Sequence, residues 1–128
     1  MRKLSLEILP ELFAVYRLEP GAVVPAPSLE ASFFSVTRTS EELSVVCPEA
    51  DAPSDIRAER GFRLFRVLGP LDFSLVGVLA SLLSPLAEAQ VSVFAVSTHD
   101  TDYVLVREGD LEKAGLALAG AGHDIKPL

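Results

Sequence analysis

The pattern of apolar residues changes its period in the second half of the chain. Residues 61–68 read as a strand. From Ser74 onward the apolar positions recur at spacings of three and four, which predicts an amphipathic helix. Asp72 or Ser74 is expected to cap this helix, and Pro85 to kink it or to begin its last part. Its apolar stripe consists of Leu75, Val78, Leu79, Leu82, Leu86 and Ala89.

The rest of the second half continues with alternating strand and helix patterns. Strands are predicted over 91–97 and 103–107, a short helix over 111–121, and a last edge strand over 123–127. Together with the preceding elements this gives the order βαββαβ. That order predicts an α+β fold of the ferredoxin-like kind, with a parallel or mixed sheet covered on one face by two helices.

The first half predicts strands but no convincing helix. Strand patterns occupy 3–9, 13–18, 32–37 and 43–47, whereas Pro25 and Pro27 place 21–31 in an irregular loop, and 48–60 reads as a polar linker.

A repeat links the two halves. Residues 34–46 align without gaps on residues 94–106, with phenylalanine, valine, hydroxyl and acidic positions in common. We interpret them as two copies of one hairpin. The chain is therefore expected to hold two related modules in tandem, a degenerate one over 1–60 and a complete one over 61–128.

Composition limits where this chain can work. Of its 128 residues 49% are hydrophobic, and the mean hydropathy is +0.36. No run reaches the roughly 18 apolar residues that a membrane span needs, so the excess apolar surface is expected in a core or a homo-oligomer interface. The N-terminus lacks the pattern of a signal peptide. We expect a cytoplasmic protein with no membrane partner.

Net charge narrows the class of ligand. The formal charge is −7 and the pI about 4.7, and the arginines between residues 57 and 66 are interspersed with acidic residues. Nucleic acid is therefore excluded as a partner, because binding phosphates requires a basic patch. An acidic surface favours a cationic or zwitterionic ligand.

The candidate chemistry does not predict an enzyme. Cys47 is the single cysteine, which excludes an intrachain disulfide, and its apolar surroundings favour a buried small hydrophobe over a nucleophile. The segment GPLDFSLVG lacks the lysine of a phosphate loop. His99, Asp100 and Asp102 could be considered as metal ligands, but three neighbours in a turn rarely converge on one ion. We expect no metal and no cofactor.

The stretch GPLDFSLVGVLASLLSPLAEAQVSVFAVSTHDTDYVLVR resembles the ACT domain, an amino-acid-sensing regulatory module. It is most similar to the ACT modules of aspartate kinase regulatory regions and of the CASTOR arginine sensors. The resemblance is strongest over 62–107, and in the first half it covers only FFSVTRTSEELSVVCPE. It implies two tandem ferredoxin-like (βαββαβ) ACT modules, the first degenerate. It also implies a homodimer, because similar sensors combine four such modules.

The resemblance also implies where a ligand binds. In similar proteins an amino acid lies where the loop before the first helix meets a strand of a neighbouring module. In the arginine sensors a carboxylate that matches Asp102 holds the ligand side chain. Carried over, the implied ligand-binding residues are Leu71, Asp72, Phe73, Ser74 and Gly77 of the loop and helix, Ser92 and Val93 of the strand, and Thr98, His99, Asp100, Thr101 and Asp102 of the turn.

The residue types of this set suit a free amino acid. Backbone N–H groups of 71–75, at a helix N-terminus, would bind its carboxylate, and either Asp72 or a strand carbonyl would bind its ammonium group. Asp100 and Asp102 would select a cationic or polar side chain. Each residue also has a structural interpretation, since Asp72 suits a helix cap and Asp100 and Asp102 suit a turn.

Two functions remain open from the sequence. One is a sensor that binds a free amino acid, either cationic or small and polar, between ACT modules of a homodimer. The other is a ligand-free interaction module that regulates a separate enzyme as its protein partner through exposed apolar surface.

Overall fold

The computed structural model describes residues 3–72 and 74–126, which fall into two compact units. The C-terminal unit combines Met1–Pro10 with Arg63–Leu128, and the N-terminal unit is Glu11–Phe62. The long strand β5 (Ala58–Val67) contributes residues to both units. No helix among the described residues has the length and apolar character needed to cross a membrane.

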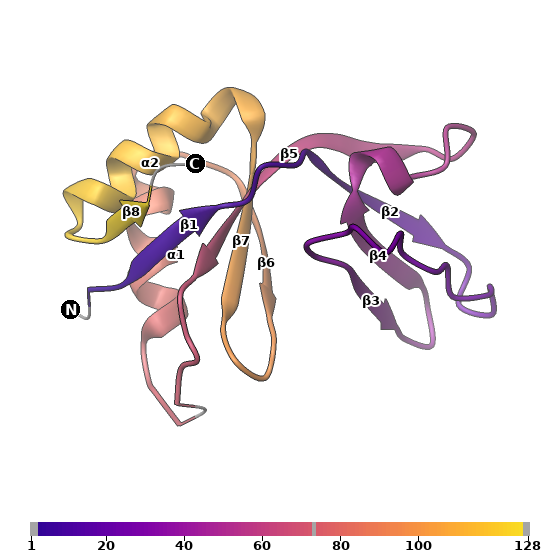
Figure 1. The fold of residues 1–128 in the computed structure, drawn as a ribbon, viewed down its shortest axis with the longest axis horizontal. Coiled ribbons are helices and arrows are strands. Elements are labelled where there is room, and N and C mark those ends of the chain that lie inside the picture. Colours follow the sequence, from indigo (N-terminus) through magenta and orange to yellow (C-terminus); the bar gives the residue numbers. More distant parts are fainter. Residues whose placement is uncertain (1–2, 73, 127–128) are drawn as a thin grey trace. The chain divides into compact units, whose positions relative to one another are not determined.

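The C-terminal unit is a mixed sheet with two helices (Figure 1). Its strands lie in the order β8-β1-β5-β7-β6, with β1 parallel to β8 and antiparallel to β5. The bounds are β1 Ser5–Ile8, α1 Val78–Glu88, β6 Val93–Ser97, β7 Asp102–Arg107, the 3-10 turn η2 Glu108–Asp110, α2 Leu111–Gly120 and β8 Asp124–Lys126. The α+β class and the βαββαβ order from β5 to β8 agree with the prediction from the sequence.

One core holds the helices against the sheet of this unit. The sheet side is built by alternate residues of β5 and β7, among them Phe65, Val67 and Val104, which are nearly inaccessible to solvent. The helix side is built by one stripe of each helix, including Leu82 and Leu118. Burying such side chains contributes about 1.5–3 kcal/mol each, so the helices are fixed by their apolar faces.

The first ten residues belong to the C-terminal unit, whereas the sequence assigns them to a module over 1–60. β1 is inserted between β8 and β5, with Leu6 buried in the core of this unit. The amide of Leu4 donates to Nδ1 of the buried His123 at 3.1 Å, and the amide of Asp124 donates to the carbonyl of Leu4 at 2.8 Å. Alternation along β1 predicts a strand but carries no information about a partner more than a hundred residues away.

Helix α1 begins later than its apolar stripe predicts. It starts at Val78, and its N-cap is Gly77 with a left-handed φ of 82°. Asp72 and Ser74 do not cap it, because the Asp72 carboxylate instead accepts the amide of Ser74 at 2.9 Å and its hydroxyl at 2.8 Å. This local turn competes with helix formation. Gly77, predicted within the helix, is therefore its boundary.

The N-terminal unit is built of antiparallel strands in the order β3-β4-β2-β5. Its elements are β2 Phe13–Leu18, β3 Ser35–Arg38, β4 Leu43–Pro48, the 3-10 turn η1 Glu49–Asp51 and the first residues of β5. All residues of this unit are described, and none lies in an α-helix. Tyr16, Val45 and Cys47 are buried in its sheet, where burial raises the pKa of the Cys47 thiol to about 11.

The two hairpins repeat, but not in the register that the sequence alignment predicts. β4 begins at residue 43 and β7 at residue 102, an offset of 59 residues, and η1 and η2 follow at the same offset. The gapless alignment assumed an offset of 60 and is wrong by one residue. Both copies are runs of apolar residues, so a shift by one position still pairs similar side chains although it exchanges the two faces of a strand.

Candidate functional site

An open pocket in the C-terminal unit lies where the loop before α1 meets the β6–β7 turn. Its volume is ≈ 210 Å³. The lining residues are Leu71, Asp72, Leu75 and Val78 from the loop and helix, and Ser97, Thr98, His99, Asp100, Thr101 and Asp102 from the hairpin.

A threonine shapes the turn. The amide of Thr98 donates to the carbonyl of Thr101 at 2.8 Å, and its hydroxyl donates to the same carbonyl at 3.1 Å. The amide of Thr101 lies 3.3 Å from the Thr98 hydroxyl. His99 and Asp100 therefore occupy the tip, where both side chains are largely exposed. Such side-chain bonds to nearby backbone are the reason that threonine suits tight turns.

The loop is fixed against this turn by two further hydrogen bonds. The hydroxyl of Thr101, which is buried, donates to the carbonyl of Val67 at 2.6 Å. The amide of Leu71 donates to the carbonyl of Asp100 at 2.7 Å. Gly69 allows this approach, because a Cβ there would lie 3.0 Å from the Leu71 nitrogen and 3.2 Å from the Asp100 oxygen. The pocket walls are thus held in place by the chain itself.

The pocket lining combines acidic and apolar residues. Asp72, Asp100 and Asp102 contribute the carboxylates, and His99 Nδ1 lies 3.0 Å from Asp100 Oδ1. The hydrogen bonds from the Ser74 amide and hydroxyl lower the pKa of Asp72 below its usual value. Leu75 and Val78 provide apolar surface in the pocket lining. This combination suits a small molecule with a cationic group and an apolar part.

Helix α1 begins at the same pocket. No side chain caps α1, and its first residue, Val78, lines the pocket. The first N–H groups of a helix lack partners within the helix and carry partial positive charge. The helix end therefore supplies hydrogen-bond donors for an anionic group, while the aspartates supply acceptors.

The structure brings together most of the residues that the resemblance implied. Leu71, Asp72 and the whole turn Thr98–Asp102 line the pocket, whereas Ser74 and Gly77 do not. Phe73 lies outside the described residues.

Val93 is the first residue of β6 and Ser92 precedes it, at the end of the strand away from the turn. Val93 pairs with Val106, whereas the turn follows Ser97, four residues along the strand. At about 3.3 Å per residue this separation is about 13 Å. Within one unit these two residues do not line the pocket beside the turn.

Three lining residues lie outside the implied set of ligand-binding residues, although the backbone amide of Leu75 was among the predicted carboxylate donors. Leu75 and Val78 were assigned to the core stripe of the helix, and Ser97 to the end of a strand. The late start of α1 is what places Leu75 ahead of the helix and Val78 at its first position. The left-handed glycine that sets this start, Gly77, was the available signal.

No metal site accompanies the pocket in the part of the chain that the structure describes. There, no three histidine, cysteine or acidic side chains are grouped so that they could hold an ion.

Comparisons with known proteins extend this description. A family model described as the ACT domain matches residues 57–119, and a second model, of an N-terminal domain, matches residues 11–55. The cytosolic arginine sensor for mTORC1 subunit 1 of Bos taurus is 34% identical over 90 residues. That match covers 62% of this chain and 27% of the sensor. The chain therefore spans about a quarter of the length of this arginine sensor.

Solved structures share the fold. The crystal structure of protein Atu0741 from Agrobacterium tumefaciens is 38% identical, with a TM-score of 0.91, and the match covers 98% of this chain and 94% of that one. The regulatory subunit of aspartate kinase from Thermus thermophilus has a TM-score of 0.63 at 9% identity, over 94% of this chain and 99% of that chain. The second similarity is one of fold alone.

Proposed function

Because this chain belongs to the ACT domain family, we propose that it is a sensor that binds a free amino acid in the pocket between the 69–75 loop and the β6–β7 turn. The match to the ACT domain and to the arginine sensors indicates that the chain is a regulatory module and not an enzyme. A cytoplasmic location stays a prediction from the sequence.

The observation that carries this proposal is a pocket whose two sides complement the two ends of an amino acid. The uncapped N-terminus of α1 offers N–H groups to a carboxylate. The carboxylates of Asp72, Asp100 and Asp102 offer acceptors to an ammonium group and to a cationic or polar side chain. Leu75 and Val78 would contact the aliphatic part of the ligand.

We further propose that the complete site forms across a homodimer of tandem modules. Ser92 and Val93 do not line the pocket of their own unit, so in this proposal they contact the ligand from another module. β6 lies at the end of the strand order, which leaves its outer edge open to a second copy. The strand order of the N-terminal unit and its repeated hairpin support the interpretation of that unit as a degenerate module.

The experiment is a thermal-shift screen of the purified protein against the twenty common amino acids. We expect one or a few of them to raise the melting temperature, because a ligand at about 100 times its Kd stabilises the folded state by about 2.7 kcal/mol. Asp102→Ala is expected to abolish the shift. Asp55→Ala, which removes an exposed carboxylate of the N-terminal unit, is expected to retain it.

The screen also separates the two functions that the sequence left open. If no amino acid changes the melting temperature or gives heat of binding, the sensor proposal fails. The alternative is then a ligand-free interaction module. Exposed apolar side chains such as Val23, Leu29 and Leu116 would contact its protein partner.

A further inference from the structure

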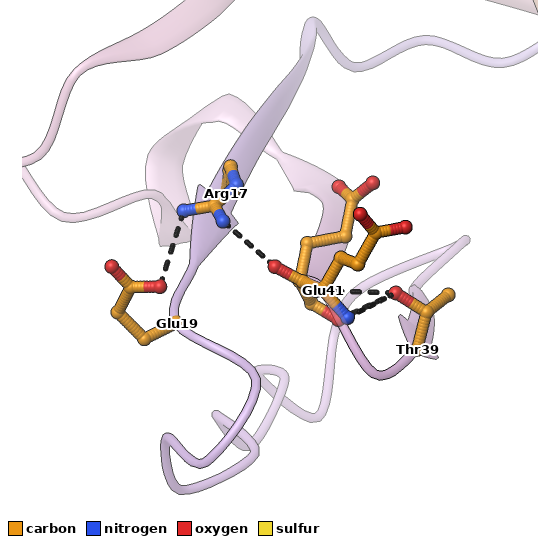
Figure 2. A network of polar contacts seen from close by, with 5 residues as sticks. Arg17, Glu19, Thr39 and Glu41 are labelled. Atoms are coloured by element: carbon orange, nitrogen blue, oxygen red, sulfur yellow. Dashed lines mark hydrogen bonds and ion pairs between the residues drawn. The ribbon is translucent and has the colours of Figure 1, made fainter.

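The turn of the first hairpin is built in the same way as the turn at the pocket. Thr39 occupies the position of Thr98 at the offset of 59 residues. Its amide donates to the carbonyl of Glu42 at 2.9 Å, as that of Thr98 does to Thr101. Its hydroxyl accepts the amides of Glu41 and Glu42, both at 3.1 Å (Figure 2). The two turns therefore share a threonine at the same position and the same backbone hydrogen bond across the turn.

The two turns differ in the group that closes them. In the C-terminal unit the carbonyl of Asp100 accepts the backbone amide of Leu71, at 2.7 Å. The equivalent carbonyl, that of Glu41, instead accepts Nη2 of Arg17 at 2.8 Å. Figure 2 shows the guanidinium of Arg17 between Glu19 and Glu41, with Nη1 3.5 Å from the Glu19 carboxylate. A side chain of β2 thus bonds the carbonyl that a loop bonds in the other unit.

This difference in hydrogen-bond donor agrees with the different segments that follow β5 and β2. After β5 the chain forms the loop that lines the pocket and then α1. After β2 it forms an irregular segment over 19–34 and no helix. With no helix after β2, the first turn lacks the wall that α1 and its loop provide to the second. The cationic side chain of Arg17 instead donates a hydrogen bond to the Glu41 carbonyl of the first turn.

We propose that Arg17 holds the first turn closed in the absence of any ligand, so that only the second turn responds to one. The N-terminal unit then keeps the same turn conformation with and without a ligand, because Arg17 supplies the cationic group. The part of this proposal that concerns the response rests on the proposed function, and the part that concerns closure by Arg17 does not.

An ordinary surface ion pair is the competing explanation for Arg17. Its side chain is half exposed, and exposed pairs such as Arg17–Glu19 contribute little to stability. The bond to the Glu41 carbonyl is a different interaction, because it is charge-assisted and closes a backbone turn. The two explanations differ in their prediction for the turn amides when Arg17 is replaced.

The test is amide hydrogen exchange of the ligand-free protein, followed by NMR. In Arg17→Ala we expect the amides of Thr39, Glu41 and Glu42 to exchange about fivefold faster, the factor that one net hydrogen bond contributes to an opening equilibrium. The amides of Thr98 and Thr101 should be unchanged, which also reports that the C-terminal unit is folded in the variant. Arg57→Ala removes an exposed arginine outside the hairpin and is the matched control.

Each outcome bears on the proposal. Unchanged exchange at residues 39–42 in Arg17→Ala would overturn it and leave Arg17 as a surface ion pair. A second arm adds to the wild-type protein an amino acid that raises its melting temperature. Slower exchange at Thr98 and Thr101 alone supports the proposal, whereas slower exchange at both turns contradicts it. If no amino acid raises the melting temperature, the proposed function fails and the first arm still decides the role of Arg17.

Discussion

Single buried polar side chains position the pocket. Among the described residues Ser81, Thr101 and His123 are the buried polar ones, and each has hydrogen bonds to backbone groups. His123 accepts at Nδ1 from a backbone amide and lies 2.9 Å from the Ser81 carbonyl at Nε2. A carbonyl can only accept, so the imidazole is the neutral tautomer with its proton on Nε2. Such bonds fix geometry that apolar packing alone leaves open.

Thr101→Val should destabilise the protein. The substitution removes the hydroxyl that donates to the Val67 carbonyl and keeps the shape of the side chain. We expect the free energy of unfolding, measured in urea, to fall by about 1–3 kcal/mol, the cost of leaving a buried polar group without a partner. Thr101→Ser keeps the hydroxyl, so its free energy of unfolding should fall by less. Equal stability of Thr101→Val and the wild type would show that this bond does not fix the loop.

Ser74→Ala should raise the pKa of Asp72 toward its ordinary value, because it removes the hydroxyl that donates to the carboxylate. A lowered carboxyl pKa stabilises the folded state above the ordinary value of about 3.9 and loses this effect as the pH falls through the folded value. The variant should therefore lose part of this acid-dependent stability change. NMR titration of the Asp72 carboxyl measures the shift, with Ser84→Ala as control. An unchanged titration curve would contradict the assignment.

At the scale of elements, periodicity identified nearly every strand and both helices, but not where α1 begins. Leu75 continues the apolar stripe, and nothing in that stripe reveals that Asp72 forms a local turn with Ser74. The same limit explains the repeat, since apolar runs align equally well in two registers. Partners of β1 were unpredictable for another reason, because its neighbours β5 and β8 come from distant parts of the chain.

Gly77→Ala should weaken α1 at its N-terminus. Gly77 has a φ of 82°, and an added Cβ would meet no atom within 4 Å, so the cost comes from the backbone alone. We expect a loss of about 1–2 kcal/mol in the free energy of unfolding. Gly109→Ala is the matched control, because its Cβ also meets no atom within 4 Å and Gly109 has no positive φ. A loss of the same size in both variants would mean that φ at Gly77 does not set the helix start.

For the whole molecule, the fold class was predictable from the sequence, whereas the arrangement of the site residues was only partly predictable. The α+β fold and the family followed from the order of the elements and from residues 69–107. The loop, the turn and the start of the helix line one pocket, and Ser92 and Val93 lie outside it. A second copy of the chain, which the resemblance already implied, is the proposed source of those two residues.

Phe94→Glu should convert the proposed dimer into a monomer. Phe94 is partly exposed on the edge strand β6, and a carboxylate there would be buried and unpaired in a dimer formed through that edge. Sedimentation should give twice 13.7 kDa for the wild type and 13.7 kDa for the variant. Leu116→Glu places the same charge on an exposed residue of α2 and should remain dimeric. Dissociation by Leu116→Glu instead would move the interface to the helices.

Binding of a free amino acid in the pocket is tested most directly by an NMR titration of the isotope-labelled protein with the amino acids. We predict that an amino acid binds and shifts the backbone amides of Leu71, Leu75, Val78 and residues 97–102. Amides of Ser92 and Val93 should shift with them if the ligand lies between two copies. Absence of binding by every amino acid, or shifts confined to residues remote from the pocket, would contradict the proposed sensor function.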